Sequence, residues 1–84
     1  MLSRIEIMDK LRDILLFADE ENKEGIEKAG EDTDLATDLG LTSVKMLYMV
    51  IAIEETFDIR FENVGFNDFK IMKDIIDYIE ANIK

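Results

Sequence analysis

Apolar residues recur three and four positions apart in three stretches of this chain, and this spacing confines the fold to packed helices. In the first stretch they form one helical face with polar residues opposite: Ile7, Met8, Leu11, Ile14, Leu15 and Ala18. Ser3 and Glu6 precede this face with the spacing of a capping box, in which two side chains satisfy free amides at a helix start. We therefore predict a first helix over residues 5–17.

The second stretch, residues 43–57, is apolar on more than one face. Its predicted core stripe combines aliphatic, aromatic and methionine side chains: Met46, Met49, Val50, Ile53 and Phe57. Leu47 and Ile51, four residues apart, form a second stripe on a neighbouring face. This second stripe is either the margin of a wide core face or a ridge that contacts a partner protein.

The third stretch carries isoleucine at every fourth position: Ile71, Ile75, Ile79 and Ile83. This repeat predicts a last helix over residues 72–82. Residues 19–38 are rich in charge and contain two glycines, so we predict a long first loop with one helical turn at residues 25–29. A short third helix is predicted over residues 63–69, with three aromatic side chains filling the core: Phe61, Phe66 and Phe69. The expected fold is all-α, a small four-helix bundle in one domain, residues 1–84.

Charge and composition exclude several classes of function. The 84 residues include 20 acidic and 10 basic side chains, and the net charge of −10 opposes binding to nucleic acid. This charge favours docking onto basic protein surfaces, although a need for solubility explains it as well. The chain contains no cysteine and no histidine, which removes disulfides and the usual ligands of zinc and haem. No run approaches the ~20 apolar residues of a membrane span, and no signal peptide is evident, so we expect a cytoplasmic protein.

Three aspartates of the first loop, Asp32, Asp34 and Asp38, have a spacing that invites comparison with a calcium-binding loop. In such a loop, however, Ala36 would take a ligand position, and Ser43 would replace the bidentate glutamate. We therefore predict a solvated loop and no metal site.

Ser43 is the principal candidate for a functional residue. The run Asp38-Leu39-Gly40-Leu41-Thr42-Ser43-Val44 delivers its hydroxyl to the start of the predicted second helix. A serine nucleophile needs an adjacent base, and this chain has no imidazole to act as one. Such a serine suits modification by another enzyme better than catalysis of its own. The simpler interpretation is that Ser43 only helps to cap the helix.

That run, followed by Ala52-Ile53-Glu54-Glu55-Thr56-Phe57-Asp58-Ile59 and then Asp74-Ile75-Ile76-Asp77-Tyr78-Ile79, resembles the acyl carrier protein family, over about residues 5 to 80. The resemblance implies a four-helix bundle that is not an enzyme. It also implies a phosphopantetheine arm, donated by coenzyme A and attached to Ser43 by a phosphopantetheinyl transferase. The thiol of this arm would carry acyl or aminoacyl groups as thioesters on a freestanding, monomeric carrier.

The resemblance also places a surface for synthase and loading enzymes on the second helix, at Thr42, Val44, Leu47, Ile51, Glu54 and Glu55. We expect an acidic strip near the end of this helix to attract basic residues of those partners: Glu54, Glu55, Asp58 and Glu62. The alternative function is an unmodified acidic adaptor that keeps the fold and binds a partner through the same helix.

Three departures from the family pattern bear on the pathway. Thr42 stands where the family most often has aspartate, Lys45 replaces an acidic or neutral residue, and Phe61-Glu62 replaces a frequent Ile-Pro. They weaken the case for a housekeeping role in fatty-acid synthesis, and polyketide or peptidyl pathways remain alternatives. Carriers of this family can shelter short acyl chains, for which four side chains are adaptable neighbours: Met46, Met49, Val50 and Ile51. A filled core is the expectation from the sequence.

Overall fold

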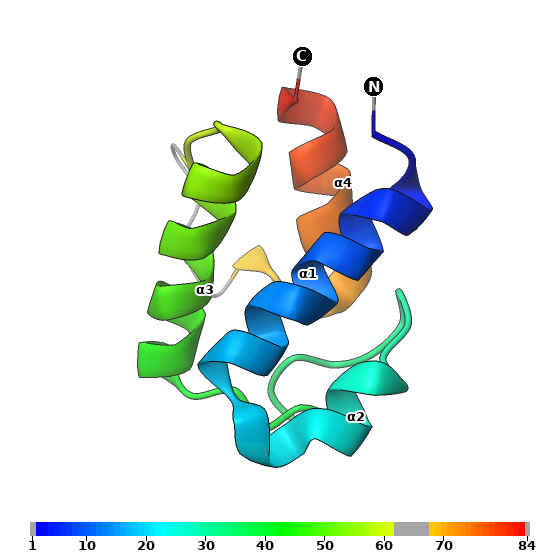
Figure 1. Ribbon diagram of the computed structural model, residues 1–84, viewed down its shortest axis with the longest axis vertical. Helices are drawn as coiled ribbons and strands as arrows, with labels where there is room; N and C mark the ends of the chain where they lie inside the picture. The colour runs from blue at the N-terminus through cyan, green and yellow to red at the C-terminus, as the bar shows by residue number, and fades with distance from the viewer. Residues whose placement is uncertain (1, 62–67, 84) are drawn as a thin grey trace.

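The computed structural model describes residues 2–61 and 68–83. Three long helices, α1 (Arg4–Ala18), α3 (Ser43–Phe57) and α4 (Met72–Asn82), form the body of the fold. A short 3-10 helix, η1 (Glu20–Asn22), and a short helix, α2 (Lys23–Glu27), follow α1. Figure 1 shows α1 crossing in front between α3 and α4, with α2 across one end, and α1 contacts all three. The predicted all-α fold is confirmed.

Local signals in the sequence set the ends of the long helices. At the start of α1 the Ser3 hydroxyl accepts a hydrogen bond from the Glu6 amide, and the Glu6 carboxylate accepts one from the Ser3 amide, both at 3.2 Å. This is the predicted capping box. At the far end of α3, Asp58 adopts a left-handed conformation with φ 55° and ends the helix. The predicted bounds of α3 and α4 are confirmed, and α1 is one residue longer at each end.

The first loop contains more structure than predicted. Its helical segment, α2, begins two residues before the predicted turn because Ile26, which is fully buried, anchors it to the core. The remaining loop is tied to the start of α4 by three backbone hydrogen bonds. The Leu35 amide donates to the Lys70 carbonyl at 2.9 Å, the Met72 amide donates to the Thr33 carbonyl at 3.0 Å, and the Lys73 amide donates to the Glu31 carbonyl at 2.8 Å. The loop therefore has a fixed path. Most of the predicted third helix, including Phe66, lies outside the described residues. Glu62 of the predicted acidic strip lies outside them as well.

The core is apolar and draws on every described helix except η1. Its completely enclosed side chains come from α1, α2, α3 and α4: Ile7, Leu11, Leu15, Ile26, Met49, Ile53, Met72, Ile75, Ile76 and Ile79. Val50 was predicted in the core but is only half-buried. Phe61 and Phe69 pack against the core, as predicted, but they are only half-buried and lie around the ring of Tyr78.

The second stripe of α3 lies outside the core. The exposed fractions are 49% for Leu47 and 50% for Ile51, whereas Ile53 on the same helix is fully enclosed. The wide-core interpretation of this stripe is therefore wrong. The two side chains are surface residues.

Two sets of ion pairs join segments that are distant in sequence. Lys45 of α3 pairs with Asp19, just after α1, at 3.0 Å between Nζ and Oδ1. The Asp19 side chain is only 9% exposed, so Lys45 neutralises a nearly buried carboxylate. At the opposite end, the Arg4 guanidinium contacts Asp77 at 2.8 Å and Glu80 at 3.3 Å, and it also contacts Glu31. Lys73 holds the second oxygen of Asp77 at 2.7 Å.

We predict that the Asp77 cluster stabilises the fold at neutral pH and not in acid. Hydrogen bonds from Lys73 and then Arg4 hold the pKa of the Asp77 carboxyl below its ordinary value. A lowered pKa in the folded state gives stability that is present above the unfolded-state pKa of about 3.9 and is lost as the pH falls through the folded-state pKa. Asp77→Asn should therefore lower the urea midpoint at neutral pH, and its difference from wild type should shrink towards about pH 3.

The control for this measurement is Asp13→Asn, which removes an exposed carboxylate of α1. Its difference from wild type should change less over the same pH range. A constant difference for Asp77→Asn would show that the cluster contributes through packing and not through charge.

A second prediction concerns the Lys45–Asp19 pair. Lys45→Met should lower the free energy of unfolding by about 1–3 kcal/mol, because it leaves the Asp19 carboxylate nearly buried without its cation. The double variant Lys45→Met/Asp19→Asn should recover part of this loss in chemical denaturation. As a matched control, Lys23→Met breaks an exposed pair with Glu27 and should cost about 0–1 kcal/mol. Additive single effects would show that the pair carries no coupling energy.

Candidate functional site

Ser43 is the first residue of α3, and its side chain is exposed. The turn before it is fixed on both sides. Leu39 is buried in the core and its carbonyl accepts a hydrogen bond from the Asn22 side chain at 3.0 Å. Gly40 then adopts φ 63°, a conformation that favours glycine, and the Leu41 amide donates to the Leu35 carbonyl at 3.0 Å. The turn therefore presents the Ser43 hydroxyl to solvent from a rigid base.

The start of α3 has a positive electrostatic potential. Thr42 caps the helix, and its hydroxyl accepts a hydrogen bond from the Lys45 amide at 3.3 Å. No acidic side chain stands in the first turn to compensate the positive end of the helix dipole. An anion attached at Ser43 would meet free backbone amides and a favourable potential. The site therefore fits a phosphate ester on Ser43.

Lys45 does not add a free cation beside Ser43, because its ammonium group is paired with Asp19. Sequence analysis identified Lys45 as a break in the acidic pattern but missed Asp19. The only signal for Asp19 in the sequence is its place directly after the apolar face of the first helix. The ion pair balances the charge of Lys45, the one basic side chain in the first turn of α3.

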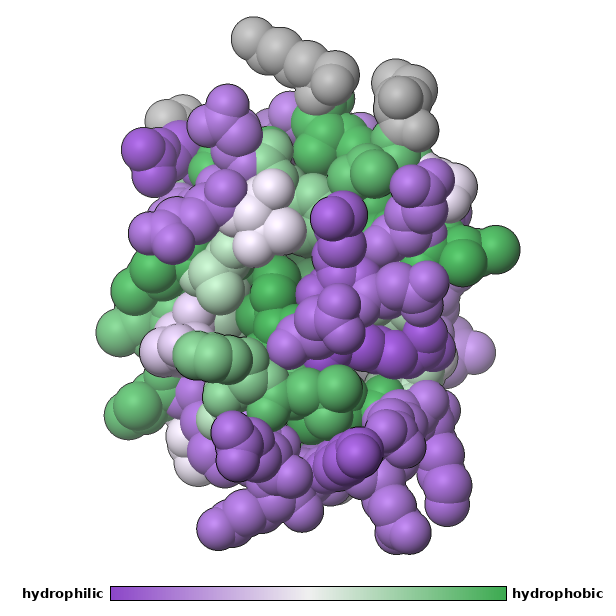
Figure 2. Space-filling view, viewed as in Figure 1, coloured by the Kyte–Doolittle hydropathy of each residue, from purple (hydrophilic) through white to green (hydrophobic). Residues whose placement is uncertain are grey.

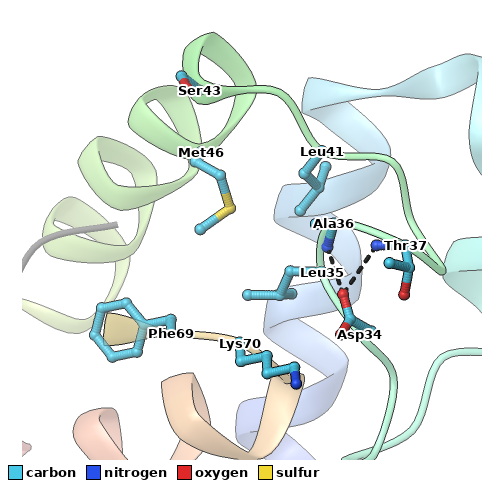
Figure 3. Close-up of a pocket in the computed structure, with 9 residues that line it drawn as sticks. All are labelled: Asp34, Leu35, Ala36, Thr37, Leu41, Ser43, Met46, Phe69 and Lys70. Atoms are coloured by element: carbon cyan, nitrogen blue, oxygen red, sulfur yellow. Dashed lines mark hydrogen bonds between the residues drawn. The ribbon is translucent and has the colours of Figure 1, made fainter. Parts of the chain in front are cut away.

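A pocket of about 420 Å³ opens beside Ser43. Its walls come from the first loop, the start of α3 and the segment before α4: Asp34, Leu35, Ala36, Thr37, Leu41, Ser43, Met46, Phe69 and Lys70. Figure 3 shows Ser43 at one end, Phe69 and Lys70 at the other, and Met46 pointing into the space between them. Among the four residues that the sequence suggested as neighbours of an acyl pocket, only Met46 lines this one. Met49 is enclosed in the core and Ile51 faces solvent.

The exposed apolar side chains of α3 form a continuous surface that we name the α3 ridge, defined as Val44, Leu47, Tyr48 and Ile51. Val44, which directly follows Ser43, is 77% exposed. Phe17, at the end of α1, stacks on the Tyr48 ring with the ring centres 6.0 Å apart and extends the ridge. Figure 2 shows apolar side chains along the edge of the molecule that α3 forms in Figure 1. Phe17 and Tyr48 were not singled out from the sequence, because they lie on different helices.

The acidic residues at the end of α3 differ in their surroundings, because one is bonded within the protein and others face solvent. The Glu54 carboxylate accepts a hydrogen bond from the Phe61 amide at 3.0 Å and lies 3.9 Å from Arg60, with 21% of its side chain exposed. Glu55 and Asp58 are exposed. Glu54 therefore helps to hold the segment after α3, while Glu55 and Asp58 present their charges to solvent.

The aspartates of the first loop shape its turns. Asp34 accepts hydrogen bonds from the Ala36 and Thr37 amides, both at 2.9 Å, and Asp38 accepts one from the Asp34 amide at 2.8 Å. The backbone amide of Thr37 contributes most to holding the pKa of the Asp34 carboxyl below its ordinary value. Among residues 2–61 and 68–83, no group of acidic side chains is arranged to hold a metal ion. In the same ranges, no helix is long and apolar enough to cross a membrane.

Comparison with known proteins agrees with this geometry. The family model described as a phosphopantetheine attachment site matches residues 6–79. The chain is 28% identical over 82 residues to the acyl carrier protein of Coprothermobacter proteolyticus, covering 98% of this chain and 96% of that protein. It is 35% identical over 63 residues to the acyl carrier protein of Trieres chinensis, covering 73% and 79%.

A solved structure supports the fold alone. The apo doublet acyl carrier protein from prodigiosin biosynthesis superposes with a TM-score of 0.62 at 17% identity, over 89% of this chain and 37% of that chain. Domains of this kind carry a phosphopantetheine prosthetic group and are not themselves enzymes. With the family model matching nearly the whole chain, this protein belongs to the acyl carrier protein family.

Proposed function

We propose that Ser43 is the residue that receives the phosphopantetheine arm, and that the chain carries acyl or aminoacyl groups as thioesters on it. The observation that carries this proposal is the position of the Ser43 hydroxyl, exposed at the positive end of α3 and at the rim of an apolar-walled pocket. The exposed hydroxyl is accessible to a transferase, and the pocket offers space for cargo. We further propose that residues 1–84 act as one carrier domain and as a monomer.

In its own modification, the chain would supply the nucleophile, which is the exposed hydroxyl of Ser43. In attachment, the Ser43 oxygen would form an ester bond to the phosphorus next to pantetheine while the diphosphate bond of coenzyme A breaks. Adenosine 3′,5′-bisphosphate would leave, and the proton of the hydroxyl would pass to a base of the transferase. The nearest lysine in sequence is paired with Asp19, and the chain has no histidine. As the family resemblance implies, the transferase would supply the acid–base groups. After attachment, the α3 amides and the helix dipole would stabilise the phosphodiester.

We predict that one phosphopantetheine attaches to the wild-type chain and none to Ser43→Ala. The measurement is intact mass after incubation with coenzyme A and a broad-specificity transferase. Ser3 is the only other serine, so Ser3→Ala is the matched control and should load like wild type. The Ser43→Ala variant should remain folded, because Thr42 provides the cap of α3.

Modification of Ser43→Ala, or no modification of the wild type by several transferases, would overturn the carrier assignment. The second result would instead favour the alternative function, an unmodified acidic adaptor that binds a partner through α3. A carrier and an adaptor would both bind partners through α3, so a binding measurement does not distinguish them. The mass of the chain does, because only the carrier gains a phosphopantetheine arm.

We propose that partner enzymes dock on the α3 ridge, together with Thr42 and Glu55. Four exposed apolar side chains on one helix form a patch that monomeric proteins seldom leave without a use. The charge of Glu55, exposed beside the ridge, would attract a basic rim on the partner and raise the association rate. Glu54 belongs to this surface by sequence, but its bond to the Phe61 amide gives it a structural role as well.

The ridge predicts a clear difference between two isoleucines of α3. Ile51→Ala should change the free energy of unfolding little, since Ile51 is half exposed, and should slow acyl transfer to a partner enzyme. Ile53→Ala, which empties an enclosed site, should lower the free energy of unfolding by about 2–5 kcal/mol. Denaturation midpoints and transfer rates are measured on both variants under conditions where both are folded. An Ile51→Ala variant with wild-type transfer rates would remove Ile51 from the docking surface.

A further inference from the structure

Phe17 and Tyr48 form an aromatic pair on the surface where two helices meet. Phe17 is 73% exposed at the end of α1, and its ring stacks on that of Tyr48 with an angle of 19° between the ring planes. Figure 1 shows the end of α1 beside the start of α3, where the Lys45–Asp19 pair also joins the two helices. One side of the Phe17 ring therefore lies against Tyr48, while most of this side chain remains open to solvent.

The exposed apolar side chains of the protein gather at this junction. Among the described residues, the large apolar side chains that are exposed belong to the α3 ridge or to Phe17, and Ile5 at the opposite end of α1 is the one exception. Single exposed apolar residues are ordinary, but a cluster of them marks an interaction surface. Phe17 makes the end of α1 part of this cluster.

Exposed carboxylates stand on the α1 side of the aromatic pair. Asp13 lies one turn before Phe17 on the same face of α1, and Glu20 and Glu21 follow the helix. None of these three carboxylates forms an ion pair with a described residue. An aromatic ring attracts a cation to its face, and arginine stacks its planar guanidinium group on a ring while it donates hydrogen bonds to carboxylates. The surroundings of Phe17 thus fit an arginine side chain of a partner.

We propose that the enzyme that modifies Ser43 contacts the end of α1 as well as the α3 ridge, and that it places an arginine on the Phe17 ring. The inference rests on the proposed modification of Ser43. Phe17 extends the ridge beside Tyr48, so an enzyme that covers the ridge to reach Ser43 also meets Phe17. Lysine fits this place less well, because its ammonium group is compact and strongly hydrated. The net charge of −10 favours a basic partner in the same way.

The test is the transfer of phosphopantetheine from coenzyme A to the full chain by a broad-specificity transferase. Initial rates at several concentrations of the chain give KM and kcat for wild type and three variants of Phe17. Phe17→Ala removes the ring, Phe17→Leu keeps an apolar side chain without the ring, and Phe17→Tyr keeps the ring. Ile5→Ala is the matched control, because Ile5 is 75% exposed on the same helix. Denaturation midpoints check that each variant is folded, as the exposure of both residues leads us to expect.

Phe17→Ala and Phe17→Leu should each raise KM about two- to fivefold, the range expected for a cation on an exposed ring, and leave kcat unchanged. Phe17→Tyr and Ile5→Ala should keep the wild-type KM. Asp13→Asn should also raise KM and weaken its dependence on salt, because it removes a charge beside the proposed arginine. Glu24→Gln, which removes an exposed carboxylate of α2, should change both less.

An unchanged KM for Phe17→Ala, or an equal rise for Ile5→Ala, would overturn the contact with α1. A wild-type KM for Phe17→Leu would overturn the arginine and show an apolar contact in its place. These results would leave the proposed function intact, because the wild-type chain would still gain the mass of the arm. The absence of any mass increase on the wild-type chain would overturn both.

Discussion

The buried face of α1 is the contact on which the rest of the structure depends. Its side chains Ile7, Leu11 and Leu15 are completely enclosed, and α1 is the helix that contacts α2, α3 and α4. The chain has no cysteine, so burial of apolar area must supply most of the free energy of folding. The position of α3, and with it the position of Ser43, follows from how α3 packs on this face.

Ser43 lies at the junction between the packed helices and the first loop. Buried Leu39 and the left-handed Gly40 fix the turn, while the Lys45–Asp19 pair ties the first turn of α3 to the end of α1. If Ser43 is the attachment residue, as proposed, this rigid placement would present the hydroxyl to a transferase in one geometry. The cation beside the serine is neutralised by its partner, which leaves the backbone amides of α3 as the local source of positive potential.

Residues of the same type have different roles in this protein. On α3, Ile53 builds the core, while Ile51 lies half exposed on the ridge only two residues earlier. Glu54 turns inward to the Phe61 amide, and Glu55 faces solvent. Lys45 is paired with the nearly buried Asp19, whereas Lys70 lines the pocket beside Ser43 and interacts electrostatically with Asp34. Residue type alone does not distinguish the members of these pairs.

The sequence by itself determined the three long helices, the cap of α1 and the identity of the candidate serine, because these features depend on apolar spacing and on residues a few positions apart. The tertiary structure decided the burial of Val50 and Phe69, the partner of Lys45 and the walls of the pocket. Each of these depends on contacts between segments distant in sequence, such as Leu35 with Lys70 and Phe17 with Tyr48. Local spacing carries no information about such contacts, since the packing angles of the helices and the path of the loop determine which side chains meet.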